Sequence, residues 1–165
     1  MCTLTNASSA TSAATAVTTI VRYMTSPPPS EFVDPFQGRG SRGLADTIGI
    51  QLIETTPSRV VATMPVDERT RQPFGILHGG ASVALAETVA SIGAVLNVDR
   101  ETQTAVGLEI NANHIRAKSE GVVRATGTPI HIGRSTQIWE IRIVDEEDRL
   151  VCLSRCTLAV VHNRR

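Results

Sequence analysis

The 165-residue chain has few aromatic side chains and no excess of charge of either sign. Phe, Trp and Tyr together make up 3% of the residues, which argues against a surface of stacked rings that binds nucleic-acid bases. Lys and Arg together number 16, as do Asp and Glu. A broad surface for nucleic acid or for an acidic membrane needs an excess of basic residues. We therefore expect neither kind of partner.

Long apolar runs and cysteines are also scarce. No apolar run approaches the roughly 20 residues of a membrane-spanning helix, and no basic start precedes an apolar core, as it would in a secretory signal. Beside Cys2, the chain has Cys152 and Cys156. On one strand these two would lie about 13 Å apart, beyond the reach of a disulfide, and no nearby pair of histidines completes a zinc site. We expect reduced, buried thiols, no metal and a cytoplasmic location.

The composition changes after about residue 38. The first part is rich in Ser, Thr and Ala and continues into SPPPSEF, where the prolines act as a spacer. We expect residues 1–38 to form a flexible tail. Residues 39–165 are enough for one domain, and an apolar fraction of 41% over the whole chain allows a hydrophobic core.

Residues 79–96 predict one long helix. The segment is rich in alanine and apolar nearly all round, which is typical of a buried helix rather than one on a surface. Between Gly80 and Asn97, Glu87 is the only charged residue. Because burying an unpaired charge is costly, either partners hold this carboxylate or its poor solvation is used in chemistry.

Two segments before this helix and four after it have the composition and alternation of β-strands. They are residues 50–54, 59–66, 105–116, 122–131, 137–145 and 150–161. The short connections between them predict antiparallel pairing. We expect an α+β fold in which a curved antiparallel sheet of five to six strands wraps one central helix, with sheet edges that dimerisation would cover.

Two long motifs carry a resemblance to a known family. QPFGILHGGASVALAET, followed by VGLEINANHIRAKSEGVVRATGTPIHIGRSTQIWEIRIVDEEDRLVCLSR, resembles the acyl-CoA thioesterases of the hotdog fold. The nearest group contains 1,4-dihydroxy-2-naphthoyl-CoA thioesterase of menaquinone biosynthesis and the proofreading thioesterase of enterobactin synthesis. Phenylacetyl-CoA and hydroxybenzoyl-CoA thioesterases are more distant. The resemblance implies hydrolysis of an acyl-CoA, with an aromatic acyl group, to free acid and coenzyme A. It implies no cofactor, because coenzyme A is part of the substrate.

The chemistry of these motifs suggests catalytic roles. Glu87 is the expected nucleophile or general base, because a poorly solvated carboxylate is strong in either role. The unpaired N–H groups at a helix start suit a developing oxyanion, and the resemblance gives this role to the Gly79 N–H, helped by His78. Gln72 can donate a second hydrogen bond there. Ser91 lies one turn after Glu87, where it could hold the carboxylate or position water.

Coenzyme A brings phosphates, so arginine is expected around the ligand. Arg116 and Arg134 are the candidates from the sequence. The resemblance adds further residues to the ligand cleft. These are Val106, Asn113, His114, Ile130, His131, Gly133 and Ser135. Beside Arg134, the hydroxyl groups of Ser135 and Thr136 could add donors to the phosphates.

Helix geometry predicts a site shared by two subunits. Gly79 and Glu87 are eight residues apart, so their backbones are separated by about 12 Å along the axis. A thioester carbonyl must lie within about 3 Å of both its donor and its attacker. We expect Gln72, His78 and Gly79 of one protomer to face Glu87 and Ser91 of the other. The family's dimers and tetramers agree with this, and predict a homodimer or homotetramer.

Two other functions stay open at the level of the sequence. One is a hotdog hydroxyacyl-thioester dehydratase, although His78 is followed by two glycines rather than the loop typical of those enzymes. The other is a non-catalytic acyl-CoA-binding or assembly module, which the presence of Gln72, His78 and Glu87 together disfavours. The acyl group, and whether it is carried by coenzyme A or by an acyl carrier protein, is not determined by these motifs.

Overall fold

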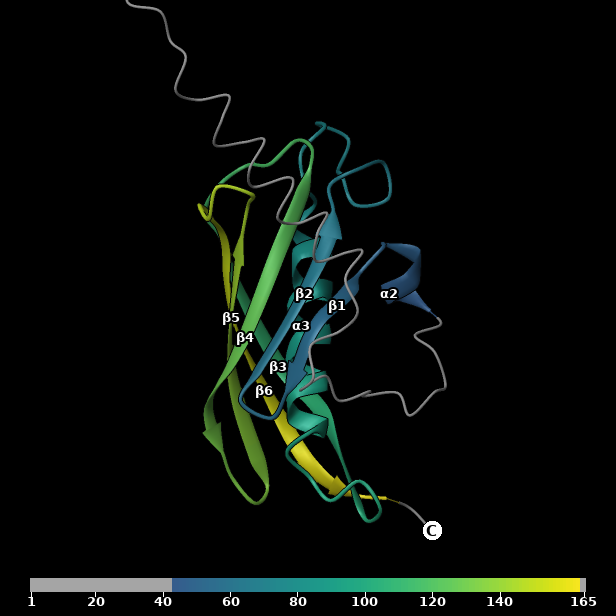
Figure 1. The fold of residues 1–165 in the computed structure, drawn as a ribbon, viewed down its shortest axis with the longest axis vertical. Coiled ribbons are helices and arrows are strands. Elements are labelled where there is room, and N and C mark those ends of the chain that lie inside the picture. Colours follow the sequence, from purple (N-terminus) through teal and green to yellow (C-terminus); the bar gives the residue numbers. More distant parts are fainter. Residues whose placement is uncertain (1–42, 164–165) are drawn as a thin grey trace, which may run out of the picture.

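The structure is a computed structural model that describes residues 43–163. The tail expected over residues 1–38, and its boundary with the domain, lie outside the described residues. Figure 1 shows one long helix beside a single curved sheet. The elements in chain order are α2 (Leu44–Thr47), β1 (Gln51–Thr56), β2 (Arg59–Pro65), α3 (Gly79–Val95), β3 (Gln103–His114), β4 (Val122–Ile132), β5 (Thr136–Val144) and β6 (Leu150–His162).

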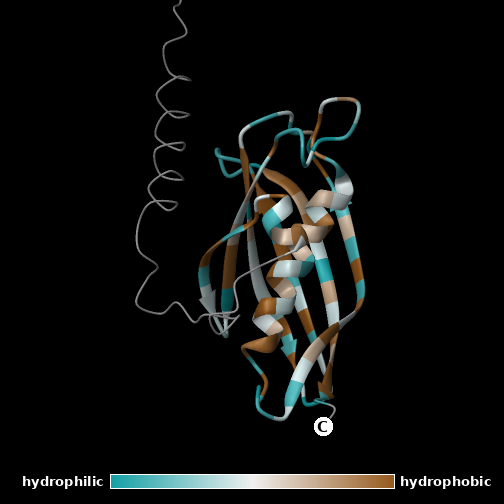
Figure 2. Ribbon diagram, turned by 90° about the vertical axis from the view of Figure 1, so that its right-hand side faces the viewer, coloured by the Kyte–Doolittle hydropathy of each residue, from teal (hydrophilic) through white to brown (hydrophobic). Residues whose placement is uncertain are grey.

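The six strands form one antiparallel sheet in the order β1-β2-β4-β5-β6-β3. Helix α3 lies across one face of this sheet, as Figure 2 shows from the side. The expected α+β hotdog architecture, with a central helix and five to six strands, is therefore confirmed. Strands β1 and β3 are the two edges, and no described strand pairs with their outer sides.

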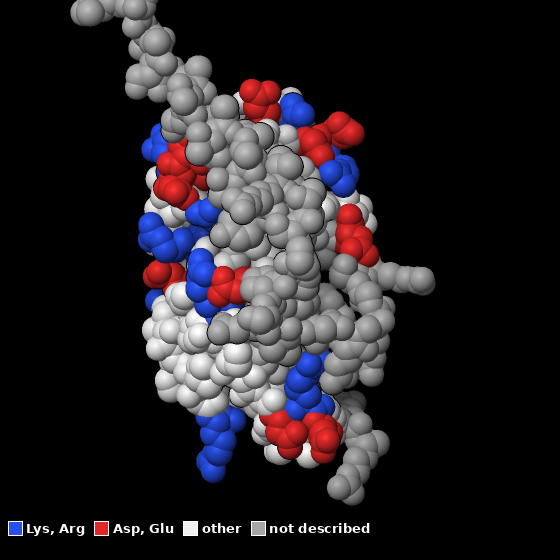
Figure 3. Space-filling model, in the orientation of Figure 1, with Lys and Arg blue, Asp and Glu red and all other residues white. Residues whose placement is uncertain are grey.

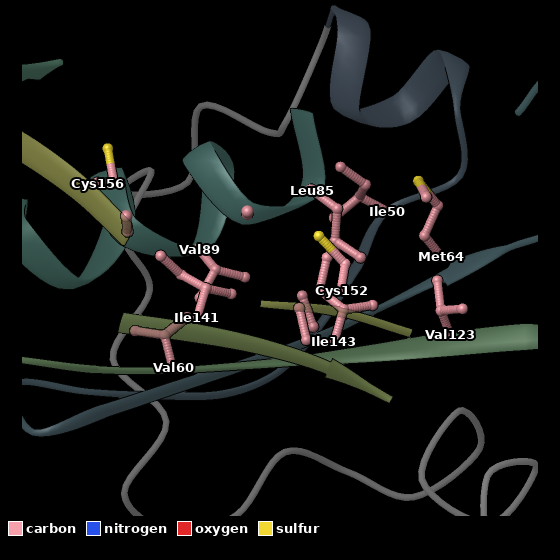
Figure 4. Close-up of a cluster of buried hydrophobic side chains, with 14 of the residues drawn as sticks. Ile50, Val60, Met64, Leu85, Val89, Val123, Ile141, Ile143, Cys152 and Cys156 are labelled. Atoms are coloured by element: carbon pink, nitrogen blue, oxygen red, sulfur yellow. The ribbon is translucent and has the colours of Figure 1, made fainter. Parts of the chain in front are cut away.

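The core fills the space between helix and sheet. Leu85 and Val89 of α3 pack towards Ile141 and Ile143 of β5 (Figure 4), and all four side chains are fully buried. Alternation along β5 explains this placement, because every second side chain of a strand points to the same face. Burial of this apolar face supplies the main driving force for the fold.

The C-terminal half of α3 lies very close to the sheet. A Cβ atom built on Gly93 would lie 2.4 Å from the ring of Trp139, so only glycine allows this approach. The buried indole Nε1–H donates to Oε1 of Gln137, and the Gln137 amide donates to the Ala94 carbonyl. Because these buried polar groups have partners, their hydrogen bonds offset the cost of desolvation and help to fix the helix on the sheet.

Only one face of α3 is buried. Leu85, Val89 and Ile92 are buried against the centre of the sheet, whereas Glu87, which lies towards the edge strand β3, is exposed and Ser91 is half-buried. The expectation of a helix buried all round is therefore not met within one chain. A six-stranded sheet curves around only part of a helix, and the composition of α3 alone did not reveal which side is left open.

Surface charge is mixed. In the described part of the face shown in Figure 3, Lys and Arg are interspersed with Asp and Glu. Cys152 and Cys156 are buried and unbonded to one another, as expected. Among residues 43–163, none of the helices has the length and apolar character needed to span a membrane.

Candidate functional site

A pocket of about 330 Å³ lies at the N-terminal end of α3. It brings together four residues that the sequence analysis selected: Gln72, Gly79, His114 and Arg116. They come from three separate segments, namely the loop after β2, the helix start and the end of β3. Figure 1 shows these loops at the same end of the molecule. The remaining lining is mainly apolar, with Ile76, Leu77, Ile115, Ala117 and Val151.

The hydrogen bonds at the helix start leave one backbone donor for a ligand. The Gly80 N–H donates to Nδ1 of His78 at 2.8 Å, so His78 is the N-cap of α3. The N–H groups of Ala81 and Ser82 donate to the His78 carbonyl. Among the described residues, nothing accepts from the Gly79 N–H. This group therefore carries the unneutralised positive end of the helix dipole into the pocket.

His78 occupies the capping role with a defined ring orientation. Since Nδ1 accepts a hydrogen bond, the neutral imidazole carries its proton on Nε2. The side chain itself is exposed. His78 thus acts on the site mainly by fixing the first turn of α3, and its Nε2–H remains a donor at the surface.

The loop before the helix is held rigidly. The His78 N–H donates to the Thr70 carbonyl, and the Leu77 N–H donates to the Lys118 carbonyl at 2.7 Å. Within the loop, Gln72 and Gly75 form a tight turn that uses a positive φ of 81° at Gly75. The Gln72 side chain is therefore presented to the pocket by backbone that is fixed at both ends.

A nearly buried ion pair supports the segment that carries Arg116. Lys118 Nζ lies 2.5 Å from Oε2 of Glu146, and the Val122 N–H donates to Oε1 of the same carboxylate. Burial raises the pKa of Glu146, but these hydrogen bonds outweigh it and hold the pKa below its usual value. Glu146 therefore ties the loop between β3 and β4 to the β5–β6 hairpin.

Glu87 does not line this pocket. Its side chain is exposed, and within residues 43–163 no hydrogen bond or ion pair holds its carboxylate. Oε1 lies over the backbone of Gly107 in β3, where a Cβ atom would be only 2.8 Å away. Ser91 is half-buried one turn further along the helix, and no hydrogen bond joins it to Glu87. The apolar pocket expected around Glu87 is thus not formed by one chain.

The remaining candidates lie near the other end of the sheet. Val106 of β3 and Thr136 of β5 flank Ala159 of β6, so they share one row of the sheet. The tip of the β4–β5 hairpin is tied to β6 by the Val160 N–H, which donates to the Ser135 carbonyl. Ile130 is 58% exposed. His131, Arg134 and Ser135 are exposed, and Gly133 is half-buried.

Two groups can be distinguished among the predicted residues. The first, called here the helix-start cluster, comprises Gln72, His78, Gly79, Asn113, His114 and Arg116. The second, called the mid-helix cluster, comprises Glu87 and Ser91 on α3. Val106 and Thr136 share a row of the sheet with Ala159, and the hairpin residues Ile130, His131, Gly133, Arg134 and Ser135 lie at that end of the sheet, outside both clusters. Asn113 is exposed beside His114 and does not line the pocket.

Gly107 contacts the site, and the sequence analysis did not select it. A glycine inside a run that otherwise predicts a strand indicates a bulge or a close approach of another group. The run VGLEINANH contains this signal. In the structure β3 does have a register irregularity between Gly107 and Glu109.

The Cys156 thiol lies near Glu87 and is not a candidate nucleophile. Burial raises the pKa of the Cys156 thiol to about 11, and the nearby carboxylates of Glu87 and Glu109 add to this. The thiol is thus protonated at neutral pH and a poor nucleophile. Among the described residues, no three His, Cys, Asp or Glu side chains converge as they would around a metal ion.

The model of the thioesterase superfamily matches residues 74–152 of the chain. A putative esterase of Bacillus subtilis, ComA2, is 59% identical over 118 residues, which are 72% of this chain and 94% of that protein. The 1,4-dihydroxy-2-naphthoyl-CoA hydrolase of Listeria monocytogenes is 50% identical over 123 residues, 74% of this chain and 99% of that protein. The proofreading thioesterase EntH of Cronobacter turicensis is 50% identical over 118 residues, with coverages of 72% and 85%.

Solved structures show the same fold. A thioesterase from Haemophilus influenzae superposes with a TM-score of 0.71 at 49% identity, covering 74% of this chain and 85% of that chain. A Staphylococcus aureus protein at 40% identity has a TM-score of 0.72, covering 73% of this chain and 100% of that chain. Its structures include variants with alanine in place of a glutamine at position 32 or a glutamate at position 47. The chain belongs to the thioesterase superfamily, with the hotdog fold, and is an enzyme that hydrolyses thioesters.

Proposed function

We propose that this thioesterase hydrolyses an acyl-CoA with an aromatic acyl group, such as 1,4-dihydroxy-2-naphthoyl or hydroxybenzoyl, to the free acid and coenzyme A. The observation that carries the proposal is the free Gly79 N–H, which opens into a pocket beside Gln72 and Arg116. Relatives named 1,4-dihydroxy-2-naphthoyl-CoA hydrolase and proofreading thioesterase support the substrate class.

The Gly79 N–H and the Gln72 amide hold the thioester oxygen. As the carbonyl carbon is attacked, negative charge grows on this oxygen, and fixed donors stabilise it without reorganising. Glu87 either attacks the carbon, giving an anhydride that water then cleaves, or removes a proton from an attacking water. In both routes the C–S bond breaks and the coenzyme A thiolate leaves. Both require the unpaired carboxylate that Glu87 has.

The spacing of Gln72 and Glu87 supports these roles. They are separated by the same number of residues as positions 32 and 47 of the Staphylococcus aureus relative, where a glutamine and a glutamate were each replaced by alanine. In this chain Gln72 lines the pocket and Glu87 does not, which supports a site that two protomers share.

The active site lies between two protomers. The helix-start cluster contacts β3 at His114 and the mid-helix cluster contacts it at Gly107, seven residues earlier or about 20 Å along the strand. The outer edge of β3 has no partner strand among the described residues, and its Val106 and Leu108 are 44% and 64% exposed. Antiparallel pairing of two β3 edges about a two-fold axis brings each helix-start cluster beside the other protomer's mid-helix cluster.

The proposed dimer also gives Arg116 and Arg134 a place around the pocket. Arg116 lines the pocket of its own protomer, whereas Arg134 approaches the same pocket from the partner's β4–β5 hairpin. Guanidinium groups on both sides suit the phosphates of coenzyme A. A homodimer satisfies this geometry, and two such dimers could form the homotetramer.

A cytoplasmic location is part of the proposal, because free Cys152 and Cys156 persist in a reducing compartment.

A thiol-trapping assay tests the reaction. The parent protein should release free thiol from aroyl-CoA substrates faster than from short aliphatic ones. Release of water from a hydroxyacyl-CoA instead would identify a dehydratase, and tight binding without turnover would identify a binding module. Either result would overturn the proposal. The same acyl groups attached to an acyl carrier protein, in place of coenzyme A, test whether carrier-bound thioesters are substrates as well.

Mixed dimers test the shared site. Gln72→Ala and Glu87→Gln each inactivate one half of the site, so both homodimers should be nearly inactive. After the two are unfolded and refolded together, half of the molecules are hybrids with one intact site, and activity should return to about a quarter of the parent. If mixing restores nothing although hybrids form, the two residues act within one protomer.

A further inference from the structure

We infer that Gly107, together with the bulge that follows it in β3, is a positioning residue that sets where the Glu87 carboxylate lies. The inference rests on the proposed function, since it concerns the orientation of the proposed nucleophile or base. It adds a residue of the strand to a site otherwise built on loops and a helix.

The bulge changes which side chains of β3 face the helix. Before it, Ala105 packs against the core and Gly107 faces Glu87, so odd-numbered positions point inward. After it, Ile110 and Ala112 pack against the core, so even-numbered positions point inward. A strand without the extra residue at 108 would keep one parity throughout. It could then present Gly107 to Glu87 or His114 to Gly79, but not both.

Glycine at 107 leaves space that the carboxylate uses. A Cβ atom there would lie 2.8 Å from Oε1 of Glu87, well inside a normal van der Waals contact. The backbone at Gly107 does not have a positive φ, so an alanine would cause no backbone strain. The group that it would displace is the free end of a flexible, exposed side chain. The fold can therefore accept alanine at 107, whereas the carboxylate has to move.

No polar interaction among the described residues fixes the position of that carboxylate. It has no hydrogen bond or ion pair within residues 43–163, and Ser91 does not reach it by a hydrogen bond. The position of the carboxylate thus depends on its close approach to the backbone of Gly107, which a side chain at this position would block. Because attack depends on distance and angle, a displacement of about 1 Å can lower the rate by about 100-fold.

A double-mutant cycle tests this. Gly107→Ala should lower kcat by about 10- to 100-fold and leave KM within about twofold, because it misplaces the attacking group and not the ligand. Glu87→Asp withdraws the carboxylate by one C–C bond, about 1.5 Å, away from the added methyl. In this background Gly107→Ala should therefore change kcat by less than about twofold. Single-turnover measurements with excess enzyme keep the slow aspartate variants measurable.

Gly127→Ala is the matched control. It is the same substitution on β4, but its Cβ would lie 2.5 Å from the core side chain of Val89. It should lower the melting temperature more than Gly107→Ala does, while the folded molecules keep the parent kcat. The inference is overturned if Gly107→Ala keeps full activity, or if it costs the same in the glutamate and aspartate backgrounds.

Glu87→Gln separates this inference from the proposed function. If the amide variant is as active as the parent, the proposed role of Glu87 fails regardless of Gly107. If the amide variant is inactive and Gly107→Ala is fully active, the role of Glu87 stands and only the positioning role fails.

Discussion

The two clusters that contribute to the site differ in how far one chain completes them. At the helix-start cluster, the loop before α3, the helix start and the loop after β3 are joined by backbone hydrogen bonds, and one donor, the Gly79 N–H, is left for a ligand. At the mid-helix cluster, Glu87 is exposed and has no hydrogen bond or ion pair among the described residues, and its carboxylate lies against Gly107. In the proposed function, the fold therefore holds the carbonyl site rigidly and leaves the Glu87 carboxylate without hydrogen-bond partners of its own chain. An acid with strong partners within its own chain would be a weaker base or nucleophile.

The largest effect is expected at the mid-helix cluster. Glu87→Gln should lower kcat by about 1,000-fold or more, because the amide neither attacks nor accepts a proton. Thermal unfolding should change little, since no ion pair is lost. Steady-state kinetics and calorimetry on the same preparation measure both. A large loss of stability would mean that Glu87 stabilises the fold, which would contradict the contrast drawn between the two clusters.

The helix-start cluster should respond less strongly. Gln72→Ala removes one of two proposed donors to the oxyanion, which typically costs about 100-fold in kcat. The Gly79 N–H remains in the variant, so a measurable rate should persist. Glutamate at the same position is the control, because it has a similar shape but repels the developing charge, and it should be slower than alanine. The kinetics of both variants on one aroyl-CoA decide this.

A substitution on the buried face of α3 should affect stability and not chemistry. Gly93→Ala places a methyl group against the ring of Trp139 in a packed core, which should cost about 1–3 kcal/mol of unfolding free energy. Since Gly93 lies on the face opposite Ser91, kcat per folded molecule should stay near the parent value. Denaturant titration measures the first and active-site-normalised kinetics the second. A selective loss of kcat would show that the two faces are coupled.

The smallest effect concerns acid. The pKa of Glu146 is lowered in the folded state by Lys118 and the Val122 N–H. Its stabilisation is therefore fully present above the unfolded-state pKa and is lost as pH falls through the lower folded-state pKa. Glu146→Gln should be less stable than the parent at neutral pH, and the difference in stability should shrink in acid. Melting curves of both proteins between about pH 3 and pH 7 would show this.

Much of this organisation follows from local patterns in the sequence. The alternation around Trp139 predicted β5, and the Ala-rich run after His78 predicted a helix that begins at Gly79, as observed. The Glu87–Gly79 spacing predicted that one protomer separates donor and acid, and the pocket does include Gly79 without Glu87. These features depend on neighbouring residues or on helix geometry, so a single sequence contains them.

Other features were not accessible from the sequence. The run 105–116 was expected to form one continuous strand, and its alternation did not reveal the bulge near Leu108. A bulge is defined by register against a partner strand, here β6, whose residues opposite the bulge are about 50 positions away in the chain. The open face of α3 was missed for a similar reason, because hydrophobic composition does not say how far a sheet curves around a helix.

The sequence by itself determined the elements, the antiparallel α+β class and the residue types that a thioester hydrolase needs, because periodicity and side-chain chemistry are local properties. The tertiary structure alone decided that His114 lies against Gly79, that Gly107 lies against Glu87, and that the acid is left exposed beside an unpaired edge strand. Such placements depend on strand register and on close packing between distant segments, which are fixed only when the whole sheet has formed around the helix.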